Sequence, residues 1–370
     1  MAEIRLEQLA HSYHRAPSQP GDYALRRMDH VWEQGGAYAL LGPSGCGKST
    51  LLNIISGLLA PSEGRVLYDG KSVNDLTPQD RNIAQVFQFP VVYDTMTVHE
   101  NLAFPLRNQG QSRERIDDRV REVAEALEIE SLLARKARNL TADEKQKVSM
   151  GRGLVRDDVA AILFDEPLTV IDPQLKWRLR RKLKEIHQRF NVTMVYVTHD
   201  QLEASTFADK IAVMYEGQIV QFGTPRELFE NPQHTFVGYF IGSPGMNLLD
   251  IALGETGLEF DGRTLAVADS IVARLRDREG GRLQLGIRPE FVQLVAPESA
   301  VLQGYVDLVQ DQGTFKIVDV RLDTPSAPVV KARLGEEVIV PEGRTGVHFP
   351  ETWQRFYVDD RLVEITHETL

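Results

Sequence analysis

Residues 42–50 read GPSGCGKST and fit the pattern G-x-x-x-x-G-K-[ST]. The apolar run AYALL (37–41) precedes this stretch, and LLNIISGLL (51–59), with helical character, follows it. Glycines in such a loop let the backbone wrap around a phosphate group, and the N–H groups of the next helix point toward it. The order of strand, loop and helix therefore favours a phosphate-binding loop over a plain glycine-rich turn.

The residues of this loop have distinct expected roles with a bound nucleotide. Lys48 is expected to neutralise the β- and γ-phosphates, and Ser49 to offer its hydroxyl to Mg²⁺. The loop residues predicted to bind ATP are Gly42, Pro43, Ser44, Gly45, Cys46, Gly47, Lys48, Ser49 and Thr50.

Two further apolar runs end in polar residues of the kinds that a phosphate-cleaving site needs. AILFDEP (161–167) ends in Asp165 and Glu166, and TMVYVTHD (193–200) ends in His199 and an acid. We expect Asp165 to reach the Mg²⁺ water shell and Glu166 to accept a proton from the attacking water. A lone histidine is more often structural, but ligand sites of α/β sheets lie at the carboxyl ends of strands. We therefore expect His199 to contact the γ-phosphate and hold the water.

The hydrophobic pattern changes along the chain and predicts the fold class. Short apolar strands alternate with helical segments in the first two-thirds, which predicts a largely parallel, buried sheet. Between about residues 112 and 140 apolar residues recur at helical spacing, which predicts a helical subdomain. After about residue 235 the runs are short and alternating, with a hairpin signal at Asp261-Gly262. The prediction is an α/β P-loop domain over 1–235, with a helical subdomain at about 88–155, followed by a mostly β barrel or sandwich over 236–370.

Composition bounds the class of protein. The chain has 370 residues, a net charge of -11 and one cysteine. The acidic balance argues against a nucleic-acid partner, because such proteins usually carry a basic face. The N-terminal stretch MAEIRLEQLAHSYH does not resemble a signal peptide, and the apolar runs are too short to span a bilayer. We expect a cytosolic protein whose membrane role, if it has one, depends on partners.

The order of the phosphate-binding loop, VFQFP (86–90), ILFDEP and VTHD resembles that of an ABC-transporter ATPase subunit over about residues 3–235. By this resemblance, Gln88 is the glutamine that senses the γ-phosphate and contacts Mg²⁺, and Asp172 is the acid that crosses a dimer interface. Tyr13 matches the aromatic residue that stacks on adenine. An apparent insertion, HRAPSQPGDY (14–23), makes Tyr23 the competing candidate, and either tyrosine could be core.

The resemblance also implies partners and a task. FVGYFIGSPGMNLL (236–249) and LGIRPEFVQL (285–294) resemble the linker and the OB-like regulatory domain of sugar and polyol importers of the maltose, glycerol-3-phosphate or glycerol type. Such ATPases work as pairs that sandwich ATP. They bind two transmembrane permease subunits, here through residues 88–106, at the cytoplasmic face of the inner membrane, and an extracytoplasmic solute-binding protein supplies the solute.

Three other interpretations are less well supported by the sequence. A soluble ABC ATPase of the repair or translation type is disfavoured by the single nucleotide domain and the regulatory domain. An importer for another solute, such as a polyamine, resembles the linker less well. A non-catalytic nucleotide-binding scaffold is disfavoured because Lys48, Glu166 and His199 are all present.

One family motif is degenerate in this chain. The family pattern L-S-G-G-Q corresponds to Leu140, Thr141, Ala142, Asp143 and Glu144. Thr141 keeps a hydroxyl that could reach the γ-phosphate of an opposing subunit. If Asp143 faces that phosphate, repulsion costs on the order of 4 kcal/mol, against ~0.3–2 kcal/mol returned by the helix N-terminus. If it turns outward, the cost mostly vanishes. The chain's own phosphate-binding loop, Glu166 and His199 keep the family pattern, whereas this motif, which would serve an opposing subunit, does not. This difference predicts a second, non-identical ATPase subunit.

Overall fold

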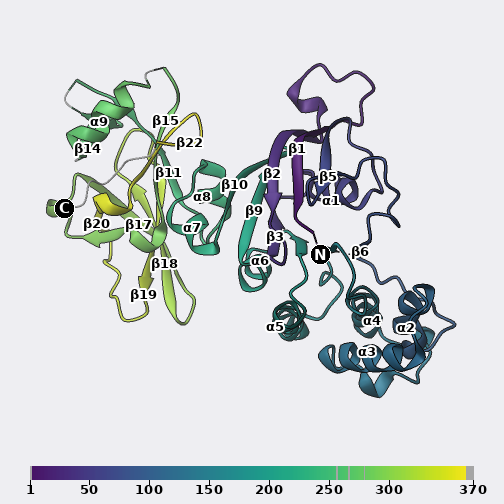
Figure 1. Ribbon diagram of the computed structural model, residues 1–370. Helices are drawn as coiled ribbons and strands as arrows, with labels where there is room; N and C mark the ends of the chain where they lie inside the picture. The colour runs from purple at the N-terminus through teal and green to yellow at the C-terminus, as the bar shows by residue number, and fades with distance from the viewer. Residues whose placement is uncertain (1, 256, 266, 279, 364–370) are drawn as a thin grey trace. The chain divides into compact units, whose positions relative to one another are not determined.

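The computed structural model describes residues 2–255, 257–265, 267–278 and 280–363 (Figure 1). The chain divides into two compact units, Met1–Pro225 and Arg226–Leu370. Each unit has a hydrophobic core of its own.

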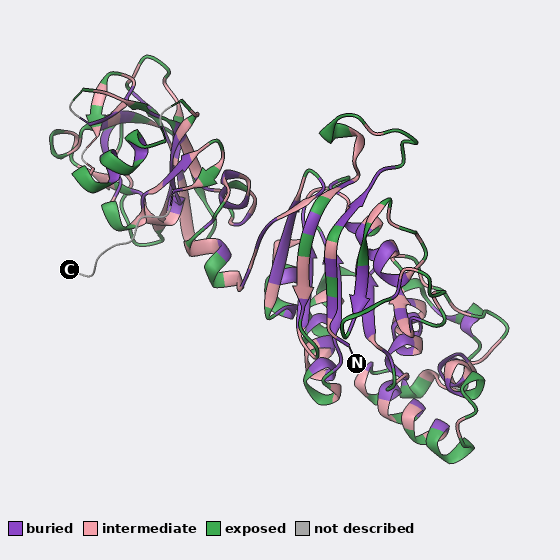
Figure 2. Cartoon of the chain, turned by 45° about the horizontal axis from the view of Figure 1, so that its top comes forward, coloured by how far each residue is buried: buried purple, intermediate pink, exposed green. Residues whose placement is uncertain are grey.

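A six-stranded sheet with the order β10-β9-β3-β8-β7-β6 forms the centre of the first unit. Three apolar runs are predicted as buried strands: one before the phosphate-binding loop, one before Glu166 and one before His199. This prediction is confirmed (Figure 2). Helix α6 (Gln201–Phe207) contacts β3 and β8, and α5 (Pro173–Phe190) packs on α6. The strands are β3 (Ala37–Leu41), β6 (Ile83–Val86), β7 (Ala161–Asp165), β8 (Met194–Thr198) and β9 (Lys210–Tyr215), with β10 (Gln218–Gly223) antiparallel to β9.

The register of the parallel strands aligns their carboxyl ends. Leu41 of β3 pairs with Thr198 of β8, and Val197 of β8 pairs with Asp165 of β7. The residues that follow these strands therefore emerge side by side at one edge of the sheet.

A second sheet of the first unit is antiparallel, with the order β2-β1-β4-β5. Its apolar side chains share one core with helix α1 (Lys48–Ser56) and with the parallel sheet. The strands are β1 (Ile4–His11), β2 (Leu25–Trp32), β4 (Glu63–Tyr68) and β5 (Lys71–Ser72), and a short 3-10 turn, η1 (Pro20–Asp22), lies in the exposed loop between β1 and β2.

The predicted helical subdomain consists of α2 (Val98–Asn108), α3 (Arg113–Ala126) and α4 (Ala142–Leu154), which pack on one another (Figure 1). The expectation of helix from about 112 to 140 was too long. Glu128 has a φ of 57°, which a right-handed helix does not allow, so the chain turns there. Two short 3-10 turns, η2 (Glu130–Leu132) and η3 (Ala137–Asn139), follow instead.

The second unit is strand-rich, as predicted, and its described residues form three sheets. Asp261 and Gly262 both have positive φ, 48° and 77°, and join two paired strands, so the predicted hairpin is confirmed. The sheets are β11 (Asn247–Asp250), β15 (Leu283–Ile287), β21 (Arg355–Val358) and β22 (Arg361–Leu362); β12 (Ala252–Leu253), β13 (Leu258–Phe260) and β14 (Arg263–Leu265); and β16 (Gln293–Val295), β20 (Arg344–His348), β17 (Leu302–Asp311), β18 (Phe315–Leu322) and β19 (Val329–Gly335).

Some segments of the second unit differ from the prediction. EEVIVPEG (336–343) is not a strand, and its Ile339 is 90% exposed, so the alternating pattern there does not reflect burial. Strands β19 and β20 on either side of it were not predicted. The stretch 236–249, expected as a linker, holds most of α8 (Thr235–Phe240) and the start of β11. The remaining helices of this region are α7 (Pro225–Glu230) and α9 (Asp269–Arg276).

In the described parts of the chain, no helix combines the length and apolar character that a bilayer span requires.

A histidine on β2 lies in an aromatic cluster. The His30 ring meets Trp32 edge-on at 4.6 Å and Phe222 at 4.5 Å between ring centroids. Its Nε2 is buried and has no hydrogen-bond partner among the described residues. Burial lowers the pKa of His30 to about 4, because the charged imidazolium would lose its hydration.

This lowered pKa predicts a pH dependence of stability. Between pH 6.5 and about 4 the unfolded chain binds a proton at His30 that the folded chain does not, so stability falls as the pH falls through this window. Relative to a His30→Phe variant, the wild-type protein should lose about 2 to 3 kcal/mol of unfolding free energy by pH 4. Denaturant unfolding at several pH values measures this difference. His14→Gln, at an exposed histidine, is the control; a similar change in pH dependence for both variants would contradict the assignment.

Candidate functional site

The loop between β3 and α1 has the backbone that its glycines require. Gly45 and Gly47 have φ values of 81° and 101°, in the region that L side chains rarely adopt. A Cβ at Gly42 would lie 2.4 Å from the carbonyl oxygen of Met214, so there is no room for a side chain. Gly47 is the N-cap of α1 and contributes no capping side chain, which leaves the first N–H groups of the helix free of a side-chain cap. These groups suit a phosphate.

Lys48 lies against this loop and is only 6% exposed. Its Nζ donates to the carbonyl oxygens of Gly42 at 2.8 Å and Pro43 at 2.9 Å. The loop therefore holds the ammonium group within its own curve, where phosphate oxygens could replace the carbonyl partners.

Ser49 and Asp165 come together from α1 and β7. The Ser49 hydroxyl donates to Asp165 Oδ1 at 3.3 Å. Burial raises the pKa of the Asp165 carboxyl, and the neighbouring charge of Glu166 adds to the effect. A hydroxyl and a half-buried carboxylate in contact are hard oxygen ligands of the kind that Mg²⁺ takes together with phosphates. The residues present therefore fit the ion.

Glu166 and His199 meet beside the loop. His199 Nδ1 lies 3.2 Å from Glu166 Oε1. The Thr169 hydroxyl donates to the Glu166 carbonyl oxygen at 3.0 Å and to the Glu166 carboxylate Oε2 at 3.4 Å. Glu166 has a φ of 44°, a costly conformation for this residue type, and its N–H donates to the Val197 carbonyl. The backbone is thus held in a strained turn at the position where Glu166 meets the histidine.

The two candidate tyrosines have different surroundings. Tyr13 is 66% exposed, and its hydroxyl lies 3.2 Å from Thr50 Oγ1 at the end of the phosphate-binding loop. The Tyr23 hydroxyl donates instead to Glu63 Oε1 at 3.0 Å. Tyr13 is therefore the tyrosine that lies beside the loop with its side chain open to solvent.

The degenerate motif forms the N-terminus of α4. Thr141 is the N-cap, and its hydroxyl accepts from the Glu144 N–H at 3.3 Å and donates to Asp143 Oδ1 at 2.8 Å. Glu144 Oε2 accepts from the Thr141 N–H at 2.8 Å. Two carboxylates of the chain itself therefore lie where an anion would otherwise meet this helix end. The sequence alone leaves the direction of Asp143 open, and in the structure its carboxylate is bonded to the Thr141 hydroxyl.

The other two predicted site residues follow strand and loop ends. Gln88 lies half-buried just beyond β6, and Asp172 is the exposed N-cap of α5, where its carboxylate accepts from the Gln174 N–H at 2.9 Å.

Gln146 of α4 is a buried polar residue near the site that the sequence analysis did not predict. It is fully buried, and its Nε2 donates to the carbonyl oxygens of Phe87 at 3.1 Å and Pro167 at 2.8 Å. The available signal was a polar residue four positions before Met150 on the apolar side of a helix.

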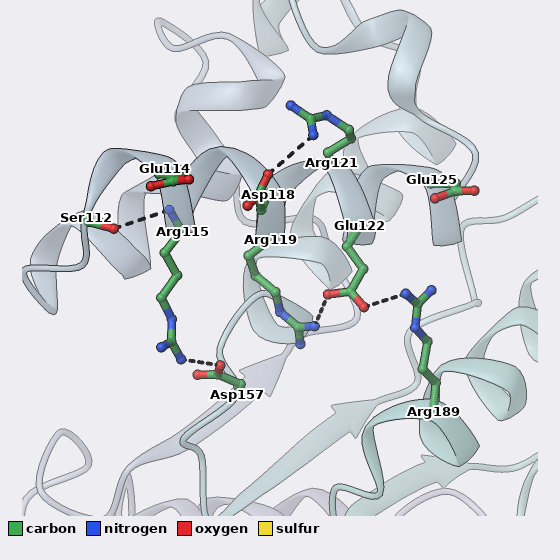
Figure 3. Close-up of a pocket in the computed structure, with 10 residues that line it drawn as sticks. All are labelled: Ser112, Glu114, Arg115, Asp118, Arg119, Arg121, Glu122, Glu125, Asp157 and Arg189. Atoms are coloured by element: carbon green, nitrogen blue, oxygen red, sulfur yellow. Dashed lines mark hydrogen bonds and ion pairs between the residues drawn. The ribbon is translucent and has the colours of Figure 1, made fainter.

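A hollow of about 580 Å³ lies beside α3, away from the strand ends (Figure 3). None of the predicted site residues lines it. Its four arginines pair with carboxylates, and Arg189 of α5 and Arg119 share Glu122 at 2.7 and 2.5 Å. The Arg115–Asp157 and Arg189–Glu122 pairs link α3 to the rest of the unit and the other pairs lie within α3, so we assign no ligand to this hollow.

The arrangement at the strand ends defines the class of the first unit. A phosphate-binding loop, with carboxylates and a histidine on the neighbouring parallel strands, makes it a P-loop ATPase domain. The helical subdomain lies between β6 and β7 in the chain.

Comparison with known proteins is consistent with this class. The family model for the ABC transporter matches residues 25–169, and that for the MalK OB fold domain matches residues 242–292. The chain is 40% identical over 319 residues to the sn-glycerol-3-phosphate import ATP-binding protein UgpC of Bordetella parapertussis, covering 84% of this chain and 88% of the relative. It is 41% identical over 315 residues to the trehalose/maltose import ATP-binding protein MalK of Thermococcus litoralis, covering 81% and 84%.

Solved structures resemble the first part of the chain. The ATP-binding cassette MJ0796, a dimer in a post-hydrolysis state bound to ADP and Pi, superposes with a TM-score of 0.53 at 28% identity, covering 60% of this chain and 98% of that one. CbiO1 of Clostridium perfringens, part of the ABC transporter complex cbiONQ, gives 0.56 at 27% identity, covering 62% and 90%. The chain therefore belongs to the ABC-transporter family of ATP-binding proteins. It is an ATP-binding ATPase subunit with a MalK-type OB-fold domain, so the expected family and fold class are confirmed.

The single cysteine gives a direct probe of the loop. Cys46 is 6% exposed, its Sγ lies 3.9 Å from Lys48 Nζ, and burial raises the pKa of the thiol. We predict slow alkylation at neutral pH that accelerates as the pH rises and that abolishes ATP binding, because the loop has no spare room. Mass spectrometry and nucleotide binding follow the reaction. Cys46→Ser is the control that should bind ATP after the same treatment; full ATPase activity of completely alkylated wild-type protein would contradict the prediction.

Proposed function

We propose that this chain is the ATP-hydrolysing subunit that powers import of a sugar or polyol, with glycerol as a candidate solute, through a membrane permease. The observation that carries the hydrolytic role is the contact between Glu166 and His199 beside the phosphate-binding loop. The importer role is supported by relatives that are named import ATP-binding proteins for sn-glycerol-3-phosphate and for trehalose/maltose.

In the proposed site, the loop from Gly42 to Thr50 wraps the phosphates of ATP. Lys48 transfers its hydrogen bonds from loop carbonyls to the β- and γ-phosphates. Tyr13 stacks on adenine, a contact worth roughly 1–3 kcal/mol for an aromatic residue and a base. Its exposed ring and its position beside Thr50 support this role over Tyr23.

Mg²⁺ is proposed to bind next to the loop. Ser49, Asp165 and Gln88 would hold it with the phosphates, and the ion would supply positive charge to the β- and γ-oxygens. A cation there would also offset the burial of the Asp165 carboxylate.

Glu166 is proposed to take a proton from the attacking water while His199 holds that water and the γ-phosphate. The hydroxyl of Thr169 steadies the Glu166 carboxylate from the opposite side. Asp172 and Thr141 are proposed to act across a dimer interface, on the site of the neighbouring ATPase subunit.

A Glu166→Gln variant tests the hydrolytic role. The amide keeps the shape of the side chain but cannot act as the base, so kcat should fall by about a hundredfold or more. ATP binding should remain, because the loop contacts do not change. Steady-state hydrolysis and equilibrium nucleotide binding measure the two quantities. Glu125→Gln, at a surface carboxylate of α3, should leave both unchanged; equal hydrolysis by wild type and Glu166→Gln would remove Glu166 as the base.

The permease is proposed to bind beside Gln88, along residues 88–106. A hollow of about 690 Å³ lies there, and Phe89 and Val91 are 68% and 50% exposed. Apolar and basic residues together suit an amphipathic helix of a membrane subunit. The hollow is lined in part by Phe87, Val91, Phe104, Pro105, Arg152 and Arg156.

This contact implies the rest of the assembly. Two transmembrane permease subunits would each bind one ATPase subunit at the cytoplasmic face of the inner membrane. An extracytoplasmic solute-binding protein would deliver the solute, so the solute is chosen by those partners.

The second ATPase subunit is proposed to be a different chain. The N-terminus of α4 is capped by Thr141 and Glu144, and Asp143 is bonded to the same hydroxyl. This end is therefore a poor phosphate ligand for a neighbouring site, while the chain's own loop, Glu166 and His199 are intact. Pairing with a subunit whose motif is complete would leave at least one efficient site.

Purification of the intact complex tests this assembly. We expect two different ATPase chains, and we expect Glu166→Gln to reduce ATPase activity far more than the same change at the matching glutamate of the partner. Native mass spectrometry and ATPase assays give both results. A complex with two copies of this chain, or equal loss from either mutation, would refute the asymmetry.

A further inference from the structure

A buried carboxylate lies directly behind the loop that carries His199. Glu203 belongs to α6, four residues after His199, and is only 4% exposed. A carboxylate is rarely buried without partners, because it loses its hydration. The contacts of Glu203 therefore show which groups stabilise the buried carboxylate and which residues it positions.

Two hydroxyl groups of β8 donate to one oxygen of this carboxylate. Glu203 Oε2 accepts from the Tyr196 hydroxyl at 3.1 Å and from the Thr198 hydroxyl at 2.9 Å. Tyr196 and Thr198 are two positions apart on a strand, so their side chains project from the same face. The carboxylate thus binds the side chains of the last residues of β8, just before His199.

The other carboxylate oxygen faces two cations of α5. Lys176 Nζ lies 3.5 Å and Arg180 Nη1 4.0 Å from Glu203 Oε1. The cations are four positions apart, on one face of the helix. They offset the buried negative charge, so Glu203 is held from α5 as well as from its own helix.

The Thr198 hydroxyl connects Glu203 to the backbone around His199. It donates to Glu203 and accepts from the Asp200 N–H at 3.0 Å. The Asp200 carboxylate in turn accepts from the N–H groups of Leu202 at 2.7 Å and Glu203 at 3.1 Å. The Thr198 side chain before His199 and the Asp200 residue after it are therefore both tied to the start of α6.

His199 itself has little packing to orient it. Its side chain is 57% exposed, yet its Nδ1 lies 3.2 Å from Glu166 Oε1. With more than half of the ring in solvent, the direction of the backbone at 198–200 has to aim the imidazole.

We propose that Glu203 is a positioning residue for His199 and acts through the Thr198 hydroxyl. The buried carboxylate fixes that hydroxyl, the hydroxyl fixes the Asp200 N–H, and the loop then presents His199 to Glu166 and to the γ-phosphate. This inference rests on the proposed role of His199 in hydrolysis.

The effect belongs to the chemical step and not to nucleotide binding. Among the described residues, no hydrogen bond or ion pair joins Lys48, Ser49 or Tyr13 to Glu203 or Thr198, so we expect ATP affinity not to depend on this link. A displacement of His199 by about 1 Å would reduce the fraction of productive geometry, and such shifts can cost as much as about a hundredfold in rate. Breaking this link should therefore lower kcat and leave KM for ATP nearly unchanged.

Thr198→Val is the most direct test. Replacement of Glu203 would leave Lys176 and Arg180 facing a buried site without their counter-charge, which strongly destabilises a fold and would confuse the result. Valine keeps the shape of threonine and removes only the hydroxyl. We expect kcat to fall on the order of tenfold, with KM for ATP within about twofold of wild type.

Two matched variants separate positioning from general destabilisation. Tyr196→Phe removes the other hydroxyl bonded to the same carboxylate oxygen but does not touch the Asp200 N–H. Its Tm should fall about as much as that of Thr198→Val, while its kcat stays within about twofold of wild type. Thr198→Ser restores the hydroxyl and should restore kcat.

The His199→Ala background completes the experiment. With His199 absent there is no ring to aim, so Thr198→Val should cause no further loss of kcat. Equal losses of kcat in Thr198→Val and Tyr196→Phe, or a further loss in the His199→Ala background, would overturn the inference. Unreduced activity of His199→Ala alone would instead overturn the proposed role of His199, which makes the two failures distinguishable.

Discussion

The register between β3, β8 and β7 is the constraint on which the site depends. Leu41 pairs with Thr198, and Val197 with Asp165, so three strands far apart in the sequence end at one level. A shift of one residue in either pairing would turn the following side chains to the opposite face of the sheet. The buried apolar residues of these strands prevent such a shift, because it would expose them or bury polar groups. The hydrophobic core therefore determines where the phosphate-binding loop, Glu166 and His199 meet.

The parts of this arrangement that were predictable share a local cause. Gly45, Gly47 and the Asp261-Gly262 turn have positive φ, and the apolar runs of β3, β7 and β8 are buried on both faces. Both signals are contained in a few consecutive residues. The end of α3 near Glu128 was not predicted, because a charged residue with positive φ carries no sign of it in the sequence. The apolar alternation at 336–343 wrongly predicted a strand, because Ile339 in this segment is exposed and the alternation does not reflect a buried face.

The residues that sequence reasoning missed act through contacts between distant elements. Gln146 joins the carbonyl oxygens of Phe87 and Pro167, and Glu203 joins α5, α6 and β8. Neither forms a motif, since each is one polar residue in a helix. Their roles become visible only when the partners are known: Gln146 Nε2 donates to backbone carbonyls next to Gln88 and Glu166, and Glu203 Oε2 accepts from the strand that precedes His199. Buried polar groups must find such partners, so they record which elements have to stay together.

The same rule about helix N-termini acts in opposite ways at two places in the first unit. At α1 the N-cap is Gly47, which has no side chain, so the exposed N–H groups and the positive end of the helix dipole are left for a phosphate. At α4 the N-cap is Thr141, and Glu144 and Asp143 supply acceptors and negative charge to that helix end from within the chain. An anion approaching α1 gains these interactions, whereas an anion approaching α4 must displace carboxylates that already hold them. A phosphate therefore gains a free helix N-terminus at α1 but meets the chain's own carboxylates at α4, which is the physical reason why the two helix ends differ as anion sites.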